Sequence, residues 1–286
     1  MTRSSTDLGQ LARIVLLLPA TIIVVVGYVL PSLVLAALSF GIVPGVWVFS
    51  EATTSHYMRL LGDIYYLRVV GYTLFLGIVV SVLTAVLAFP VGYYLARSRS
   101  RLTSLYAVLT FTPLAVGMNM VTLGWMIILG KTGFINALLL QTGAINDPLQ
   151  LLYGWGAVIV AMVHVVFTFM VLPIEAVVRQ IDPSLEKAAR ILGAGPIRTF
   201  IEVVLPLSLP GIAAGFLIVF LQVCGAFVLP LLLGGQGFTL MPIAIWEQIT
   251  VSFDRSFAAT LSVALILISI VVMLLQMRIM REKSLV

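Results

Sequence analysis

Few side chains in the apolar parts of this chain could hold a charge or bind a polar ligand. The 286 residues include 16 lysines and arginines, 11 aspartates and glutamates, and two histidines. An ionisable or polar group inside a long apolar stretch is a functional candidate by default. Within such stretches, or in the polar loop at residues 234–254, six side chains are candidates for lining a path for a solute: Asn119, Thr122, Trp125, His164, Gln222 and Glu247. The alternative for each is an ordinary packing role between helices or in a solvated loop.

The chain has too few of the residue types that bind metals or nucleotides to form a metal site or an ATP site. Cys224 is the single cysteine, so neither an internal disulfide nor a cysteine-based zinc site is expected. His56 and His164 are too few and too scattered for a metal cluster. The Gly-Lys-Thr at residues 130–132 resembles the end of a phosphate-binding loop, but the upstream glycine that this loop requires is replaced by Trp125. We therefore expect no catalytic residue, metal, cofactor or ATP site in the chain.

The densest set of charged residues lies at positions 179–211. Asp182 followed by Pro183 is a helix start signal, because aspartate caps the free N–H groups and proline fits the first helical position. Glu186 and Arg190 have the spacing of an i,i+4 ion pair, and so do Glu175 and Arg179 at the end of the preceding apolar stretch. Gly193 predicts the end of this short helix. A second amphipathic piece, residues 197–205, leads to Pro206 and Pro210, where a long apolar stretch begins.

One face of this short helix is apolar. It carries Leu185, Ala188, Ala189 and Leu192, with charged residues on either side. A helix of this kind fits a groove on another protein. It also fits the surface of a bilayer, and the residue pattern alone does not choose between the two.

The elements that must position these residues are membrane helices. Sixty-one per cent of the residues are hydrophobic and 9% are charged, a balance typical of proteins solvated by lipid. Six stretches have the roughly 20 apolar residues that a bilayer-crossing helix needs: residues 14–40, 69–95, 105–129, 152–178, 207–233 and 257–277. Prolines inside most of them predict kinks. The expected fold is an all-α integral membrane protein with about six transmembrane helices and a cytoplasmic helix between the fourth and fifth.

The distribution of basic residues predicts the orientation. With the N-terminus in the cytoplasm, all but four of the 16 lysines and arginines fall on the inner side, the exceptions being Arg59, Arg68, Lys131 and Arg255. Inner loops of membrane proteins are enriched in these residues. Both termini, and the charged loop at 179–206, are therefore expected in the cytoplasm, and nucleic acid is not an expected partner despite the net charge of +5.

The charged loop resembles the EAA loop of binding-protein-dependent ABC importer permeases. The resemblance rests on the run Ala188-Ala189-Arg190-Ile191-Leu192-Gly193-Ala194, on Phe200, and on residues 205–212, Leu-Pro-Leu-Ser-Leu-Pro-Gly-Ile. It extends through Pro113, residues 131–133, Asp182-Pro183 and Gly234-Gly235, and covers roughly residue 69 to the C-terminus. Within the family, the chain is most similar to spermidine/putrescine-type permeases.

The resemblance implies which segments form the permease domain and which residues couple it to an ATPase. Residues 1–68 would form an N-terminal tail, a first helix and an outer loop, and residues 69–286 the permease domain. In the family this loop forms the coupling helix, which docks on the ATPase subunit. The implied coupling residues are Leu185, Glu186, Lys187, Ala188, Ala189, Arg190, Leu192, Gly193 and Ala194. Asp182, Pro183, Pro206, Pro210 and Gly211 would shape the loop.

The implied partners are a cytoplasmic ATPase dimer, a second homologous permease subunit, an extracytoplasmic solute-binding protein and a small solute such as a polyamine, in the bacterial inner membrane. One residue departs from the family pattern: Lys187 stands where relatives carry a glutamate. The contact made there should therefore come either from Glu186 or from Lys187 to an acidic group on the ATPase. Two other functions stay open, an ion-coupled secondary transporter and a membrane scaffold subunit that transports nothing.

Overall fold

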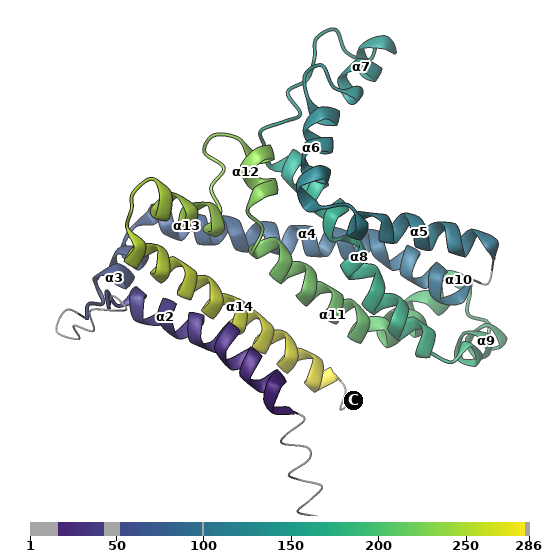
Figure 1. Ribbon diagram of the computed structural model, residues 1–286. Coiled ribbons are helices and arrows are strands. Elements are labelled where there is room, and N and C mark those ends of the chain that lie inside the picture. Colours follow the sequence, from purple (N-terminus) through teal and green to yellow (C-terminus); the bar gives the residue numbers. More distant parts are fainter. Residues whose placement is uncertain (1–16, 43–51, 99, 284–286) are drawn as a thin grey trace, which may run out of the picture. The chain divides into compact units, whose positions relative to one another are not determined.

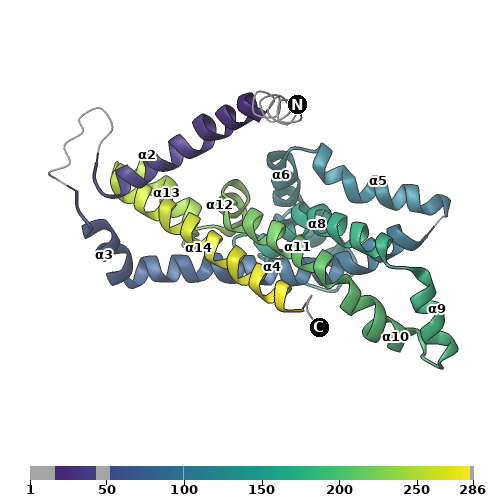
Figure 2. The ribbon, with the colours of Figure 1, turned by 90° about the horizontal axis from the view of Figure 1, so that it is seen from below.

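The computed structural model describes residues 17–42, 52–98 and 100–283 (Figure 1). Three residues of the predicted charge asymmetry, Arg3, Arg13 and Arg99, lie outside this part of the chain, as does the start of the first predicted span. All regular elements in the described ranges are helices (Figures 1 and 2).

Within these ranges, six helical segments are long and apolar enough to cross a membrane, which confirms the predicted number. They are Leu17–Ser39, Ile64–Arg97, Met118–Gln141, Trp155–Gln180, Pro196–Cys224 and Arg255–Arg278.

The structure corrects two of the predicted spans. The third, predicted as one helix over 105–129, is broken into α5 (Arg101–Ala115) and α6 (Met118–Leu129), with extended backbone at Val116. Pro113 removes one backbone donor near the end of α5, and Gly117 is the N-cap of α6, so the first helix stops between them. The fifth, predicted over 207–233, ends at Cys224, and Gly225 separates α11 (Leu205–Cys224) from the short α12 (Val228–Gly234).

The described residues divide into two compact units. One lies within Met1–Tyr66 and Ala244–Leu267, and the other within Leu67–Ile243 and Ile268–Val286. The predicted boundary at residue 69, between an N-terminal segment and the permease domain, stays a prediction. Three helices contribute to both units, namely α4 (Ile64–Arg97), α13 (Met241–Thr250) and α14 (Arg255–Lys283).

The smaller unit also contains the π-helical turn η1 (Val25–Val29), α2 (Leu30–Ser39) and α3 (Ser55–Gly62). It is held by polar contacts between segments distant in sequence. The hydroxyls of Ser39 and Tyr57 are 2.7 Å apart, and Thr260 donates to the Ser39 carbonyl. Arg59 pairs with Asp254 at 3.1 Å and stacks over the Phe257 ring. Asp254 is therefore engaged within its own unit.

The core of the larger unit is α8 (Trp155–Gln180). Its buried residues recur every three or four positions, as a helix with one packed face requires: Ala157, Val158, Ala161, Met162, Val166, Met170, Val171, Ile174 and Val178. The helix contacts α11 more extensively than any other element, and α5, α6 and α12 also pack on it.

The direction of the helices follows from their contacts. Gly92 of α4 faces Ile174, and Arg97 lies beside Ile181, so α4 runs parallel to α8. Gly211 faces Pro173 and Gly215 faces Met170, so α11 runs antiparallel to α8. Gly211 and Gly215, four residues apart, therefore allow α11 to pack closely against α8. As a result, α4 and α8 end, and α11 begins, at the same end of the unit as the charged loop (Figures 1 and 2).

Candidate functional site

The charged loop forms a short helix, α9 (Pro183–Ile191), that is fixed at both ends. The Asp182 carboxylate accepts a hydrogen bond from the Ser184 backbone N–H at 2.8 Å, which confirms the predicted cap. This backbone hydrogen bond lowers the pKa of Asp182. At the other end the chain turns at Gly193, whose φ of +87° favours glycine. The helix is therefore one preformed unit at the end of α8.

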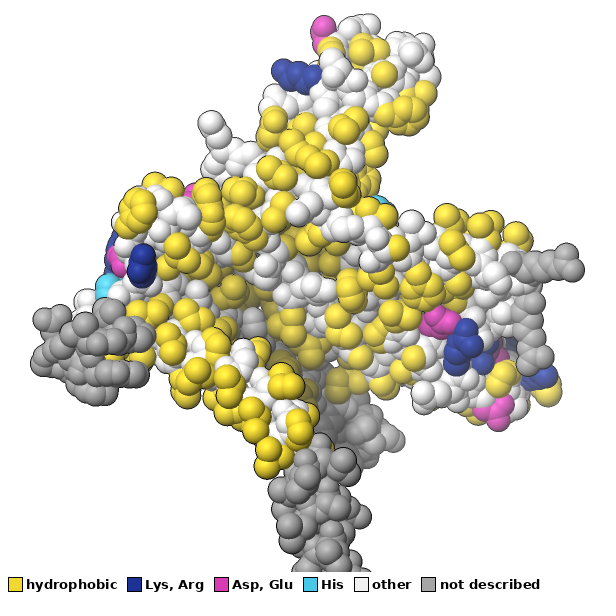
Figure 3. All heavy atoms as spheres, viewed as in Figure 1, with side chains coloured by type: hydrophobic (Ala, Val, Ile, Leu, Met, Phe, Trp, Pro, Cys, Tyr) yellow, Lys and Arg dark blue, Asp and Glu magenta, His cyan; other side chains and the backbone are white. Residues whose placement is uncertain are grey.

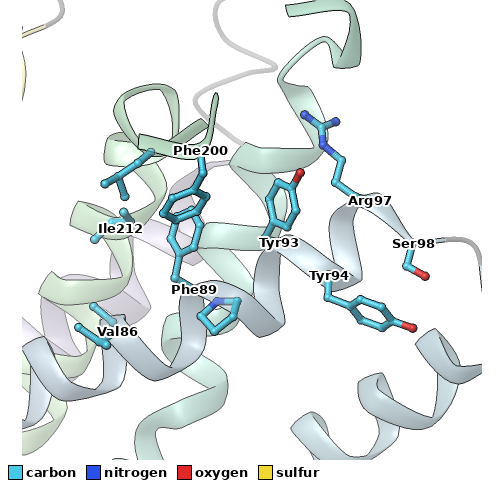
Figure 4. Close-up of a pocket in the computed structure, with 11 residues that line it drawn as sticks. Val86, Phe89, Tyr93, Tyr94, Arg97, Ser98, Phe200 and Ile212 are labelled. Carbon is cyan, nitrogen blue, oxygen red and sulfur yellow. The ribbon is translucent and has the colours of Figure 1, made fainter. Parts of the chain in front are cut away.

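The inward side of α9 carries a buried carboxylate. Glu186 accepts hydrogen bonds from the Tyr93 hydroxyl at 2.8 Å and from Arg97 Nε at 3.0 Å. Arg97 also donates to the Ile181 carbonyl at 2.9 Å. The predicted i,i+4 pair of Glu186 with Arg190 is therefore wrong, because Glu186 points into the protein, toward α4. Figure 4 shows Tyr93 and Arg97 on the same side of α4, with Tyr94 turned away.

The outward side of α9 is apolar and exposed. Ile191 and Leu192 keep 86% and 87% of their surface accessible, and Leu185 keeps 46%. Ala188, Lys187, Arg190 and Gly193 are also exposed, whereas Ala189 and Ala194 are half-buried. Charged side chains gather mainly over this end of the larger unit (Figure 3).

The chain continues through α10 (Pro196–Thr199) and the π-helical turn η3 (Phe200–Val204) into α11. Pro206 lies at the start of α11 and Pro210 inside it. A Cβ added to Gly211 would lie 2.7 Å from the Pro173 carbonyl oxygen, so a side chain there would push α11 off α8. The prolines and this glycine therefore set how the loop enters the fifth span.

A groove of about 840 Å³ lies between α4 and the start of α11 (Figure 4). Its walls are mostly apolar, and Phe89 and Phe200 meet edge to face across it at 5.2 Å. Tyr93, Arg97 and Ser98 form its polar end.

Two of the six path candidates are brought together. The Trp125 indole N–H donates to His164 Nδ1 at 3.2 Å, joining α6 to α8. Because an indole N–H can only donate, Nδ1 must be the acceptor and the ring proton lies on Nε2. In this geometry His164 is neutral and exposed, and its ring is oriented by Trp125.

Among the described residues, no hydrogen bond or ion pair joins the other four candidates to Trp125 or His164. Thr122 is buried and donates to the Met118 carbonyl of its own helix. Asn119 and Gln222 are exposed on α6 and α11. Glu247 is half-buried on α13, in the smaller unit.

Tyr93 and Arg97 were not predicted as partners of the loop. Arg97 entered the predicted charge asymmetry only as a basic residue at the end of a span. The available signal was weak: Tyr93 and Arg97 lie four residues apart, on one helix face, next to a loop with an acidic residue. By contrast, the predicted Glu175–Arg179 pair is confirmed, with Arg179 Nε 3.0 Å from Oε1. In the part of the chain that is described, no group of three or more histidines, cysteines and acidic residues could hold a metal ion.

Comparison with known proteins explains this architecture. Residues 88–283 match the family model of the binding-protein-dependent transport system inner membrane component. The chain is 31% identical to the spermidine/putrescine transport system permease protein PotB of Salmonella typhimurium strain SL1344, over 79% of this chain and 78% of that protein. It is 32% identical to PotB of Escherichia coli K12, over 76% of this chain and 78% of that protein.

The fold is similar to a chain in the crystal structure of a bacterial alginate ABC transporter in complex with an alginate-bound periplasmic protein. The TM-score is 0.77 at 18% identity, covering 96% of each chain. The match of the family model over most of the chain confirms the resemblance carried by the charged loop. The chain is thus a multi-pass inner-membrane protein that belongs to the family of binding-protein-dependent transport system inner membrane components.

Proposed function

We propose that this chain is the permease subunit of a polyamine importer driven by a separate ATPase, and that α9 is its coupling helix. The observation that carries the proposal is the outward side of α9, where Ile191 and Leu192 are almost fully exposed beside Lys187 and Arg190. Large aliphatic side chains that project from a charged loop are typical of a surface that a partner covers. The partner that fits is the cytoplasmic ATPase, present as a dimer with one protomer for each permease subunit.

The buried state of Glu186 favours one of the two docking hypotheses. Both carboxylate oxygens accept hydrogen bonds from α4, so Glu186 has no free oxygen for an ATPase. Lys187 is exposed and lies about 100° further around the helix. We infer that Lys187 contacts an acidic group on the ATPase.

A charge reversal tests this contact. Lys187→Glu should lower transport-coupled ATPase activity about tenfold, the effect of placing like charges in contact. Arg190→Glu, on the same helix and also exposed, is the matched control and should have the smaller effect. Full activity in Lys187→Glu would contradict the lysine contact while leaving the importer function intact.

The substrate proposal rests on the relatives and on Trp125 with His164. A neutral imidazole does not repel a polycation, and an indole face attracts one. We propose that Trp125 and His164 line the path, with the exposed Asn119 and Gln222 as further candidates. Proteoliposomes that contain the purified complex should take up labelled spermidine or putrescine. Trp125→Ala should reduce this uptake about fivefold, as the loss of about 1 kcal/mol from a cation–π contact predicts.

The same assay separates the alternatives. Uptake that requires ATP and an extracytoplasmic binding protein supports the importer. Uptake driven by an ion gradient alone would favour a secondary transporter, and no uptake of any solute would favour a scaffold subunit. The importer also requires a second permease subunit, which we propose to be a related chain rather than an identical copy. Co-purification of two distinct permease chains would support this heterodimer.

The orientation follows from the same proposal. Arg97 and Arg179 lie at the end of the larger unit that carries α9, and Lys131 follows α6 on the other side of a span. We propose that the α9 end and both termini face the cytoplasm. A reporter enzyme active only in the cytoplasm, fused at either terminus, should be active.

A further inference from the structure

We propose that Tyr93 and Arg97 are positioning residues that connect α9 to the end of α4, so that α4 moves together with the coupling helix. The proposal rests on the function proposed above, in which an ATPase displaces α9. The connection formed by Tyr93, Arg97 and Glu186, with the Ile181 carbonyl, is called the α4 tether below.

The α4 tether holds α9 at two separate points. Glu186 lies inside α9 and accepts from Tyr93 and Arg97. Ile181 precedes the Asp182 cap and accepts from the other side of the same guanidinium. A planar guanidinium that binds two acceptors fixes an orientation as well as a distance. The tether therefore constrains the angle of α9 relative to α4.

The α4 tether also joins two helices that are far apart in the sequence. The backbone joins α9 to α8 and, through α10 and η3, to α11. No such link joins α9 to α4, since Glu186 is 89 residues from Arg97 and 93 from Tyr93. Displacement of α9 is passed to α8 and α11 through the chain itself, whereas α4 needs a noncovalent connection.

The chemistry of the α4 tether is better suited to passing movement from α9 to α4 than to holding the two helices together. Gly92 already packs α4 against Ile174 of α8, and such apolar contacts allow helices to slide. Charge-assisted hydrogen bonds are short and directional, so they resist sliding. A buried ion pair, moreover, is weak evidence for stability, since well-packed apolar residues often do as well. An ion cluster at this position is therefore better explained by directional control.

The experiment compares the α4 tether with an exposed pair on the same loop. Arg198 and Glu202 form an i,i+4 pair at 2.9 Å, with more than half of each side chain accessible. The tether variants are Tyr93→Phe, Arg97→Gln and Glu186→Gln, and the matched controls are Arg198→Gln and Glu202→Gln. Each permease is reconstituted with its ATPase and binding protein. A fluorophore attached to Ser98→Cys, directly after α4, reports the movement of this helix end. Labelling is specific to this position because the native Cys224 is buried.

Two quantities are measured, the ATP-dependent fluorescence change and the solute transported per ATP hydrolysed. In the tether variants both should fall about tenfold, within the usual range of coupling between sites, while the ATPase subunit stays bound. Arg97→Lys keeps the charge but not the fork of donors, so it should restore part of the signal. The control variants should behave as the wild type.

Equal signals in the tether and control variants would overturn the proposal that the α4 tether passes movement from α9 to α4. If Glu186→Gln fails to fold, Tyr93→Phe still tests it, since this change removes one hydroxyl and leaves the ion pair. A Tyr93→Phe protein with lower thermal stability but an unchanged fluorescence response would assign the contact a structural role only, and so also contradict the proposal. If the wild-type chain retains no ATPase subunit, the proposed function fails first, and that result is distinct from either outcome.

Discussion

The two sides of α9 are arranged oppositely to those of a helix on a water-soluble protein. On the inward side Glu186 is buried, and on the outward side Ile191 and Leu192 are exposed. A soluble helix buries its aliphatic stripe and leaves its carboxylates in water. In this inverted arrangement the inward side contacts α4 through Glu186, and we propose that a partner covers the outward side.

The inversion also separates two kinds of contact energy. Apolar burial on the outward side is non-directional and proportional to area. The hydrogen bonds on the inward side are directional and depend on both partners being present. Substitutions on the two sides should therefore fail in different ways, and three predictions test that difference.

The largest effect is expected on the outward side. Replacing both Ile191 and Leu192 by alanine removes about six buried methylene equivalents, worth about 0.8 kcal/mol each, so affinity for the ATPase subunit should fall about a thousandfold or more. The permease itself should keep its thermal stability, because both side chains are exposed in the isolated chain. Binding can be measured by titration of the ATPase into detergent-solubilised permease. Unchanged affinity would show that no partner covers this side.

An intermediate effect is expected on the inward side. Glu186→Ala leaves Arg97, whose side chain is only 18% accessible, without its counter-ion. Breaking a buried pair in this way costs about 3 kcal/mol of folding free energy. Glu202→Ala breaks an exposed pair on the same loop and should cost less than about 1 kcal/mol. Thermal unfolding of the two variants in the same detergent measures the contrast, and equal melting temperatures would contradict it.

The smallest effect is expected at the Asp182 cap, at the start of α9. Asp182→Ala removes the acceptor for the Ser184 N–H and should destabilise α9 by less than the loss of the buried pair does. Because the folded pKa of Asp182 is lowered, the stabilisation by the carboxylate is present above the unfolded pKa of about 3.9 and is lost as pH falls through the lower, folded value.

Protease sensitivity of the loop, measured as a function of pH, reports on this cap. Cleavage at residues 183–192 should increase at the acid end for the wild type. Asp182→Asn keeps an acceptor without a titrating group, so its cleavage should change less with pH. A wild-type loop with no pH dependence would mean that the cap does not control α9.

Much of the architecture could be predicted from local sequence. Apolar stretches of sufficient length predict spans, and the described chain has the expected six. The cap at Asp182, the end of α9 at Gly193 and the pair of Glu175 with Arg179 depend on neighbours within four residues, and all were predicted. The break between α5 and α6 was not, because Pro113 is tolerated in many membrane helices and hydropathy continues across the break.

The partners of Glu186 and His164 were decided only by the tertiary structure. Glu186 had an equally well-spaced partner nearby in Arg190, yet it pairs with Arg97, because the parallel packing of α4 on α8 brings the end of α4 beneath α9. His164 meets Trp125 because α6 packs against α8. The sequence by itself determined the number of spans, both ends of α9 and the family motif, since these depend on residue type and short spacing. Which side of α9 is buried depended on how distant helices pack, and short spacing carries no information about that.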